Sequence, residues 1–460
     1  MHVKQDILMS AQPAIIATPA NEQHERAGYY GYVVLLFFVC FAFSYLDRQV
    51  VSILVQPIKQ TLGLTDVQIG LMQGISFTMC YATAGVFVAR WVDRANRVKL
   101  IAACVAIWGA STVLCGFATN FTELLFARAG TAVAEAALSP AVLSIFSDLF
   151  APRKVTRASS IFMLGPYVGG GLALFGGGFL FTLSSDHTAS AWLATHGLTP
   201  WQSVFVAVGL PGFLLSALVL FTVREPARRG LGGAGAADED DLPSMREVMR
   251  ELFVRNRFCL PYFAAYVALI TLFYAHAAWF PALLMRTFQL DARTVGELAA
   301  PAYMLGGVLG VVCAGLLAAR ATDRSALRRV LGLSTGGAAI LIPAAFAMPL
   351  MSHSLAAVVL YGVCAFAASI AMALAPVPLQ IALPNRMRGR AIALLVFMTN
   401  AISGSVGPFA VGAINEHLGR TASSLGTALA LVGTVAAIAS FLCYALATRR
   451  AAVALASGSE

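Results

Sequence analysis

Long apolar stretches recur along the whole chain and are separated by short hydrophilic segments. A helix needs about 20 mostly apolar residues to cross the hydrocarbon core of a bilayer, and scanning for stretches of this kind gives twelve. They run approximately over residues 29–58, 66–90, 98–118, 121–149, 157–182, 201–223, 258–285, 294–319, 327–347, 354–383, 390–415 and 423–447. Charged residues are rare within them, which is typical of membrane-spanning helices. The pattern therefore predicts an all-α integral membrane protein with twelve transmembrane helices.

The composition excludes a water-soluble enzyme. Apolar residues make up 59% of the 460 residues, charged residues make up 12%, and the mean hydropathy is +0.78. A soluble domain carries about 25% charged residues, so this chain has too few polar side chains to cover a globular surface. The eight cysteines lie in or beside the apolar stretches without Cys-x-x-Cys spacing. We therefore expect free, buried thiols.

Positive charges are concentrated in alternate hydrophilic segments. If the amino terminus is cytoplasmic, 25 of the 31 Lys and Arg residues fall on the inside, and only Lys59, Arg286, Arg293 and Arg420 fall outside. The positive-inside rule then places both termini in the cytoplasm. The formal charge of +9 thus reflects topology, and we expect no nucleic-acid partner. The first 28 residues show no cleavable signal peptide, and the excess of Arg over Lys favours a bacterial inner membrane.

The spans divide the chain into two sets of six. We expect a cytoplasmic amino-terminal tail at 1–28, a first bundle at 29–223, a cytoplasmic linker at 224–257, a second bundle at 258–447 and a cytoplasmic tail at 448–460. In the linker, Met245, Val248, Met249 and Leu252 recur at helical spacing, which predicts an amphipathic helix. Such a helix either lies on the inner leaflet with a regulatory role or serves as a spacer, and we favour the spacer.

The two halves repeat several features in the same order. Asp93-Arg94 is echoed by Asp323-Arg324, the basic segment after Pro152 by the one after Pro384, and Gly165-Pro166 by Gly407-Pro408. Three echoes in one order are better explained by duplication than by chance. Internal repeats of this kind are the structural basis of alternating access in many transporters.

The segment Asp93-Arg94-Ala95-Asn96-Arg97 resembles the loop signature of the major facilitator superfamily, with Ala89 and Asn96 in place of its two usual glycines. Gly165-Pro166 resembles the helix 5 motif of the same superfamily. The resemblance covers essentially the whole chain and implies two six-helix bundles related by a pseudo-twofold axis. We expect conformational gating by six residues, although a solvated basic loop and ordinary small-residue packing are the simpler alternatives. These residues are Asp93, Arg94, Arg97, Asp148, Gly165 and Pro166.

A narrower resemblance is to the Spinster branch of this superfamily. It rests on Asp47-Arg48, Asn96-Arg97, Arg128 with Glu135-Ala136, and Ser147-Asp148-Leu149-Phe150. The sequence departs from the branch at Ala132 and Ala134, where glycines usually precede the helix 4 glutamate. The resemblance implies transport of lipids such as sphingosine-1-phosphate or lysophospholipids.

Four charges are predicted to lie inside the first bundle. Asp47 and Arg48 are adjacent near the middle of the first span, whereas Arg128 and Glu135 are seven residues apart and share one helix face. An unpaired charge at a helix centre costs about 2.5–3.5 kcal/mol on insertion scales, so we expect mutual pairing. Burial and a neighbouring guanidinium act oppositely on a carboxyl group. We therefore assign proton coupling to Asp47 and Glu135 and anion binding to Arg48 and Arg128, with a static salt-bridge set as the alternative.

The second half offers aromatic residues instead of buried acids. Tyr274, His276 and Trp279 in span 258–285, with Tyr303 in the next span, are candidate substrate-binding residues. A cavity with one charged and one aromatic wall suits an amphipathic anion. Plain aromatic packing and a structural histidine are the alternatives.

The sequence thus predicts a proton-coupled lipid transporter and leaves a second possibility open. A facilitator of small organic anions such as sugar acids would use Arg48 to hold a carboxylate. An intramembrane enzyme and a receptor are disfavoured, because six of the seven histidines lie at the terminus or near loops. We expect no cofactor and no metal apart from the proton as coupling ion. The expected partners are the anionic lipid substrate, protons and the bilayer, with the chain acting as a monomer.

Overall fold

A computed structural model of the chain describes residues 20–228, 244–319, 326–419 and 421–457. Within these ranges the secondary structure is entirely helical. Eleven of the described helical segments are long and apolar enough to cross a membrane, each matching one predicted stretch. The remaining predicted stretch, 66–90, which is the second along the chain, forms three consecutive helical pieces from Asp66 to Arg94. The structure therefore confirms the all-helical membrane fold.

The amino-terminal bundle contains the first six predicted spans. In chain order its helices are α1 (Ala20–Leu62), α2 (Asp66–Leu71), η1 (Met72–Ser76), α3 (Phe77–Arg94), α4 (Arg97–Cys115), α5 (Phe121–Glu135), α6 (Leu138–Leu149), α7 (Pro152–Phe162), α8 (Gly165–Ser184) and α10 (Pro200–Thr222). A short helix that the hydropathy pattern did not predict, α9 (His187–Thr195), lies in the connection between α8 and α10.

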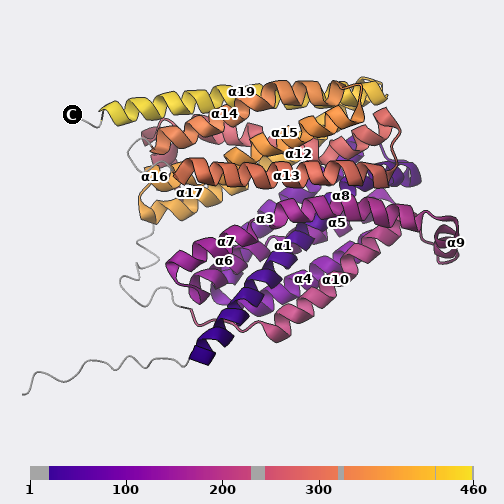
Figure 1. The fold of residues 1–460 in the computed structure, drawn as a ribbon, viewed down its shortest axis with the longest axis horizontal. Coiled ribbons are helices and arrows are strands. Elements are labelled where there is room, and N and C mark those ends of the chain that lie inside the picture. Colours follow the sequence, from indigo (N-terminus) through magenta and orange to yellow (C-terminus); the bar gives the residue numbers. More distant parts are fainter. Residues whose placement is uncertain (1–19, 229–243, 320–325, 420, 458–460) are drawn as a thin grey trace, which may run out of the picture.

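The carboxy-terminal bundle contains the last six predicted spans. It consists of α12 (Cys259–Phe288), α13 (Ala292–Ala319), α14 (Ala326–Ala347), η4 (Met348–Leu350), α15 (Ser354–Leu374), α16 (Val377–Ala382), α17 (Asn385–Met398), η5 (Thr399–Ser403), α18 (Gly404–His417) and α19 (Ala422–Ser457). The two bundles lie side by side, with α8 and α13 adjacent along their boundary (Figure 1). We call the membrane side that holds Ala20 and Ser457 the tail side and the opposite side the far side.

Several spans predicted as single helices are interrupted. The fourth span breaks at Ala136 and Ala137, directly after Glu135, and the fifth breaks just before Gly165-Pro166. Proline has no backbone N–H to continue the helical hydrogen bonds and favours the first turn of a new helix, which explains the second break. The spans predicted at 121–149 and 157–182 are both present, and each consists of two consecutive helices.

The bundles meet tightly in their far-side halves because glycines line the contact. A Cβ atom on Gly296 of α13 would overlap the carbonyl oxygen of Leu174 in α8, and one on Gly70 of α2 would lie 2.8 Å from the carbonyl oxygen of Pro408 in α18. Only glycine permits such an approach of two backbones. The echoed motifs of the two halves belong to helices of this contact: α8 begins with Gly165-Pro166, and α18 contains Gly407-Pro408. We call this contact the glycine seam.

The amphipathic segment of the linker forms helix α11 (Met245–Arg250), which continues into η3 (Glu251–Arg255). Its apolar positions Val248 and Leu252 are fully buried in the core of the carboxy-terminal bundle, and Phe253 contacts Phe263 of α12. Part of the hydrophobic stripe therefore packs on the carboxy-terminal bundle, whereas Met245 and Met249 stay exposed.

Candidate functional site

Two ion pairs connect α1 and α5 in the interior of the amino-terminal bundle. Arg48 Nη2 lies 2.9 Å from Glu135 Oε2, and Arg128 Nη1 lies 3.2 Å from Asp47 Oδ2. The structure thus brings together all four charged residues that the sequence placed in this bundle. Each acid is paired with a cation of the other helix, so the pairs cross-link α1 and α5.

Helix geometry explains why the neighbours Asp47 and Arg48 choose different partners. Successive residues of an α-helix point about 100° apart, whereas residues seven apart return to nearly the same face about 10 Å further along the axis. Asp47 and Arg48 therefore diverge from one turn of α1. Arg128 and Glu135 present two separate positions along one face of α5, and each receives one of the two divergent side chains.

The two pairs differ in access to solvent. Asp47 and Arg128 are buried, as is Glu135, whereas 12% of the Arg48 side chain is exposed. Each pair is joined through a single oxygen of its acid. Among the described residues, Asp47 Oδ1 and Glu135 Oε1 have no hydrogen-bond partner. Buried polar atoms are nearly always paired, so the unpaired oxygens make both acids candidates for accepting a proton or a ligand donor.

An aromatic cluster surrounds the exposed arginine. The guanidinium carbon of Arg48 lies 4.8 Å from the ring centre of Tyr45, 4.6 Å from that of Phe77 and 4.9 Å from that of Tyr81. The guanidinium carbon of Arg128 lies 4.9 Å from the ring centre of the same Phe77. Cations bind aromatic faces at such distances. Sequence reasoning missed these rings, although Phe77 and Tyr81 are four residues apart and so share one face of α3.

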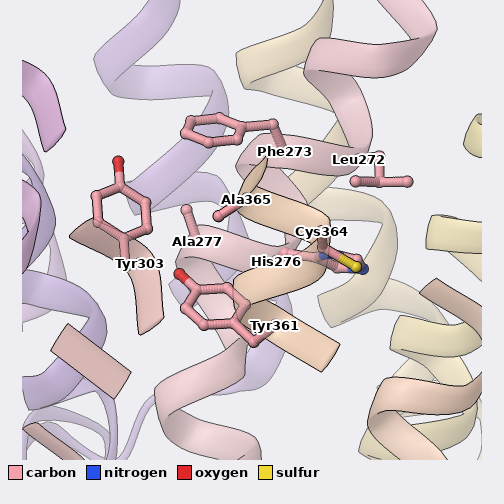
Figure 2. A pocket seen from close by; sticks show the side chains of 8 residues that line it. All are labelled: Leu272, Phe273, His276, Ala277, Tyr303, Tyr361, Cys364 and Ala365. Carbon is pink, nitrogen blue, oxygen red and sulfur yellow. The ribbon is translucent and has the colours of Figure 1, made fainter. Parts of the chain in front are cut away.

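The carboxy-terminal bundle contains a small cavity with several aromatic side chains in its wall. The cavity is about the size of a single water molecule. Figure 2 shows the cavity between α12, α13 and α15. It is lined by Leu272, Phe273, His276, Ala277, Tyr303, Tyr361, Cys364 and Ala365. Tyr361 stacks on Phe280 with ring centres 4.1 Å apart. His276 is buried, and within the described structure neither of its ring nitrogens has a partner.

Of the predicted substrate residues of this bundle, His276 and Tyr303 line this cavity together, whereas Tyr274 and Trp279 are not part of its lining. Tyr303 contacts Tyr167 of the other bundle, with ring centres 6.2 Å apart, and Tyr274 donates to Asn400 Oδ1 across 3.4 Å. Trp279 is buried and donates its indole N–H to the carbonyl oxygen of Pro408 over 2.9 Å. Trp279 therefore packs α12 against α18, which agrees with the packing alternative for that residue.

The predicted gating residues form contacts inside the amino-terminal bundle. Arg97 lies 2.5 Å from Asp148 and 2.7 Å from Glu225, so it ties the start of α4 to the end of α6 and to the segment after α10. Arg94 is exposed, and the side chain of Asp93 lies outside the described residues. Gly165, beside Pro166, packs against Phe41 of α1. The exchange of contacts with the neighbouring bundle was expected of Asp93, so it stays a prediction.

A buried acid at the far side was missed by the sequence reasoning. Asp66, outside the eleven candidate spans, accepts two hydrogen bonds from Arg286 of the opposite bundle, at 3.0 and 2.7 Å. Lys59 and Asn415 also donate to it, at 2.7 and 2.6 Å. Burial alone would raise the pKa of Asp66, but the hydrogen bonds and charges of Arg286 and Lys59 outweigh it and hold the pKa below its usual value.

Comparison with known proteins identifies the family. Residues 37–408 match the family model of the Major Facilitator Superfamily. An MFS-type efflux pump of Mycolicibacterium smegmatis is 28% identical over 448 residues, covering 96% of this chain and 98% of the pump. The probable L-galactonate transporter of Escherichia coli is 24% identical over 59% of this chain and 58% of its own length. Protein spinster homolog 1 of Xenopus laevis is 29% identical over 55% of this chain and 46% of its own length.

A solved structure supports the same relationship. The crystal structure of a bacterial homologue of the human lysosomal transporter Spinster, in an inward-facing and unoccupied conformation, superposes with a TM-score of 0.76 at 25% identity, covering 92% of this chain and 97% of that one. The helical order, the paired bundles and the sequence matches agree. The chain belongs to the Major Facilitator Superfamily and is similar to its Spinster branch.

Proposed function

We propose that this transporter moves an amphipathic anionic lipid, of the sphingosine-1-phosphate or lysophospholipid type, across the membrane in exchange for, or together with, protons. The observation that carries the proposal is the Arg48–Glu135 pair, a buried acid held through one oxygen to an arginine that keeps partial access to solvent. Alternating access between the two bundles would carry the substrate past this pair.

The proton enters the scheme through competition for Arg48. When Glu135 is ionised, it occupies the guanidinium of Arg48. When Glu135 takes up a proton, Arg48 loses a charged partner and becomes available to an anionic head group. Asp47 and Arg128 form the sealed pair beside it, and Arg128 lies over the same Phe77 ring as Arg48. A proton moving down a membrane potential supplies about 2.3 kcal/mol per 100 mV, enough to bias two conformations.

The surroundings of Arg48 favour a substrate with a long apolar part. Tyr45, Phe77 and Tyr81 surround the guanidinium, and the opposite bundle presents an aromatic wall around Tyr303 and Tyr361. An anionic head at Arg48 and an alkyl chain along these rings would use both walls. The likeness to Spinster proteins supports a lipid of this kind.

We further propose that the tail side faces the cytoplasm of a bacterial inner membrane, as the distribution of Lys and Arg favours. The glycine seam and the Asp66–Arg286 contact then close the periplasmic side. In this orientation the structure corresponds to an inward-facing state, like that of the superposed Spinster homologue.

Transport of small organic anions such as sugar acids is the second candidate. The match to a probable L-galactonate transporter favours it, and Arg48 would hold the carboxylate. A sugar acid needs several hydrogen-bonding groups around its hydroxyls. The aromatic surroundings of Arg48 offer few of them, so we rank this candidate below the lipid.

A binding experiment separates the two candidates. Thermal unfolding of the purified protein is followed with lysophosphatidic acid, with the uncharged monoacylglycerol of the same chain length, and with galactonate. We expect stabilisation by the anionic lysolipid only, and we expect Arg48→Ala to remove it while Arg94→Ala, at an exposed position, retains it. Stabilisation by galactonate without an effect of the lysolipid would overturn the lipid proposal in favour of the sugar acid.

A further inference from the structure

A hydrogen bond joins the two bundles directly beside the charged site. The side-chain amide of Gln49 in α1 donates from Nε2 to the carbonyl oxygen of Ala277 in α12, across 2.6 Å. Gln49 Nε2 also donates to Ser52 Oγ at 3.1 Å, which fixes the orientation of the amide. Gln49 directly follows Arg48, and Ala277 directly follows His276 in the wall of the small cavity.

The carbonyl of Ala277 is available because of a proline one turn later. In an α-helix the carbonyl of residue i accepts from the N–H of residue i+4, and for Ala277 that residue is Pro281, which lies inside α12 and has no N–H. A buried carbonyl without a donor is costly. The donor that α12 cannot supply comes from Gln49 in the opposite bundle.

Three consecutive residues of α1 therefore point to three different parts of the molecule. Asp47 contacts Arg128 within its own bundle, Arg48 contacts Glu135 and the aromatic cluster, and Gln49 contacts the carboxy-terminal bundle. One turn of helix thus connects the buried charges to both bundles. If this turn moves when the charge pairs change, the hydrogen bond from Gln49 to Ala277 changes with it.

We propose that Gln49 is a positioning residue. Its hydrogen bond to the Ala277 carbonyl, which Pro281 leaves without a donor in α12, holds the ion pairs of α1 next to the aromatic residues of α12 while the far side is closed. The bond joins elements that separate when the far side opens, so it stabilises the state seen here. The inference rests on the proposed alternating access and is independent of which substrate is carried.

The test is a double-mutant cycle between Gln49 and Pro281. Gln49→Leu removes the donor and keeps most of the volume, and Pro281→Ala supplies α12 with its own N–H for the Ala277 carbonyl. Spin labels at Lys154 and Arg386 on the tail side, and at Gln60 and Ser352 on the far side, report the two conformations. These four side chains are exposed. All variants are made in one background in which the eight native cysteines are replaced.

With Pro281 present, Gln49→Leu should raise the ratio of far-side-open to far-side-closed molecules about two- to tenfold, the range expected for one hydrogen bond. In the Pro281→Ala background the same substitution should change the ratio less than twofold, because the carbonyl then has a donor within α12. Pro343→Ala in α14 serves as the matched proline control and should leave the full effect of Gln49→Leu in place.

Equal effects of Gln49→Leu in both backgrounds would overturn the inference, as would no effect in either. These results are distinguishable from a failure of the proposed function. If the labels report a single conformation in every variant and with the lysolipid present, alternating access itself is wrong. If the lysolipid moves the equilibrium but Gln49 does not, only the role of Gln49 is wrong.

Discussion

At the scale of single residues, the two ion pairs of α1 and α5 differ in access to solvent, and we propose different roles for them on that ground. Arg48 keeps partial exposure beside Glu135, whereas Asp47 and Arg128 are sealed. Removing one partner of a sealed pair leaves an uncompensated buried charge, which costs about 3–5 kcal/mol. We therefore assign the exchange with substrate and protons to Arg48 and Glu135, and the support of that exchange to the sealed pair.

Glu135→Gln should abolish uptake driven by a pH gradient in proteoliposomes while leaving the fold intact. Glutamine has the shape of protonated glutamate and accepts a hydrogen bond from Arg48, but it releases no proton. Uptake of labelled lysolipid with and without an imposed gradient measures the effect, and a loss of at least about tenfold is expected for removal of a proton-transferring group. Glu123→Gln near the start of α5 is the matched control. Full gradient-driven uptake by the Glu135 variant would rule out this coupling scheme.

Asp66 should keep the far side closed over the physiological pH range. Its pKa is lowered by Arg286 and Lys59, so its contribution is complete above the usual pKa of an aspartate and is lost only as pH falls through the lower value. In a Glu135→Gln background, where the proposed coupling acid no longer titrates, the far-side label distances should thus be equal at pH 8 and pH 5. Asp66→Asn should open the far side at both pH values. A closed-to-open change of the Glu135→Gln protein between pH 8 and pH 5 that Asp66→Asn removes would contradict this assignment.

At the scale of helices, the glycine seam determines how closely the bundles approach. Gly70 of α2 lies against α18, and Gly296 of α13 lies against α8. The two contacts come from equivalent places in the two halves, and Pro408 of the echoed Gly407-Pro408 motif lies in one of them. Small residues at these positions serve the closed far side and have no need to contact substrate.

Gly296→Ala should weaken the closed far side. The added methyl group overlaps the carbonyl oxygen of Leu174, so the helices must move apart, and overpacking of this kind costs about 1–3 kcal/mol. Gly315→Ala in the same helix is the matched control, because a Cβ atom there meets nothing within 4 Å. The far-side label distances measure the result. If both variants keep the same closed fraction as the parent, the seam does not limit closure.

At the scale of the whole molecule, both described chain ends and the described parts of the linker, 224–228 and 244–257, lie on one membrane side, in agreement with an even number of spans. We expect this side to be cytoplasmic. In intact cells, a cysteine introduced at Ser185 should react with a membrane-impermeant maleimide, whereas one at Lys154 should react only after the membrane is opened. The reverse labelling pattern would invert the topology, and with it the direction in which protons drive transport.

The sequence by itself determined the membrane class, the number and order of the spans and four of the charged residues inside the first bundle. It could do so because a bilayer demands long apolar helices and makes any charge within them exceptional. These are properties of the local chain, so they can be read without knowing which helices meet. Hydropathy alone could not predict the helix breaks after Glu135 and before Gly165, nor the short helix α9.

Only the tertiary structure decided which partners meet across helices. The sequence could not pair Asp47 with Arg128 instead of with its neighbour, nor place Tyr45, Phe77 and Tyr81 around Arg48, because these contacts join residues of different helices. The buried Asp66 and the contact between Gln49 and Ala277 have the same origin. Hydropathy indicates which stretches of the chain span the membrane, whereas the crossing and rotation of packed helices fix which side chains touch.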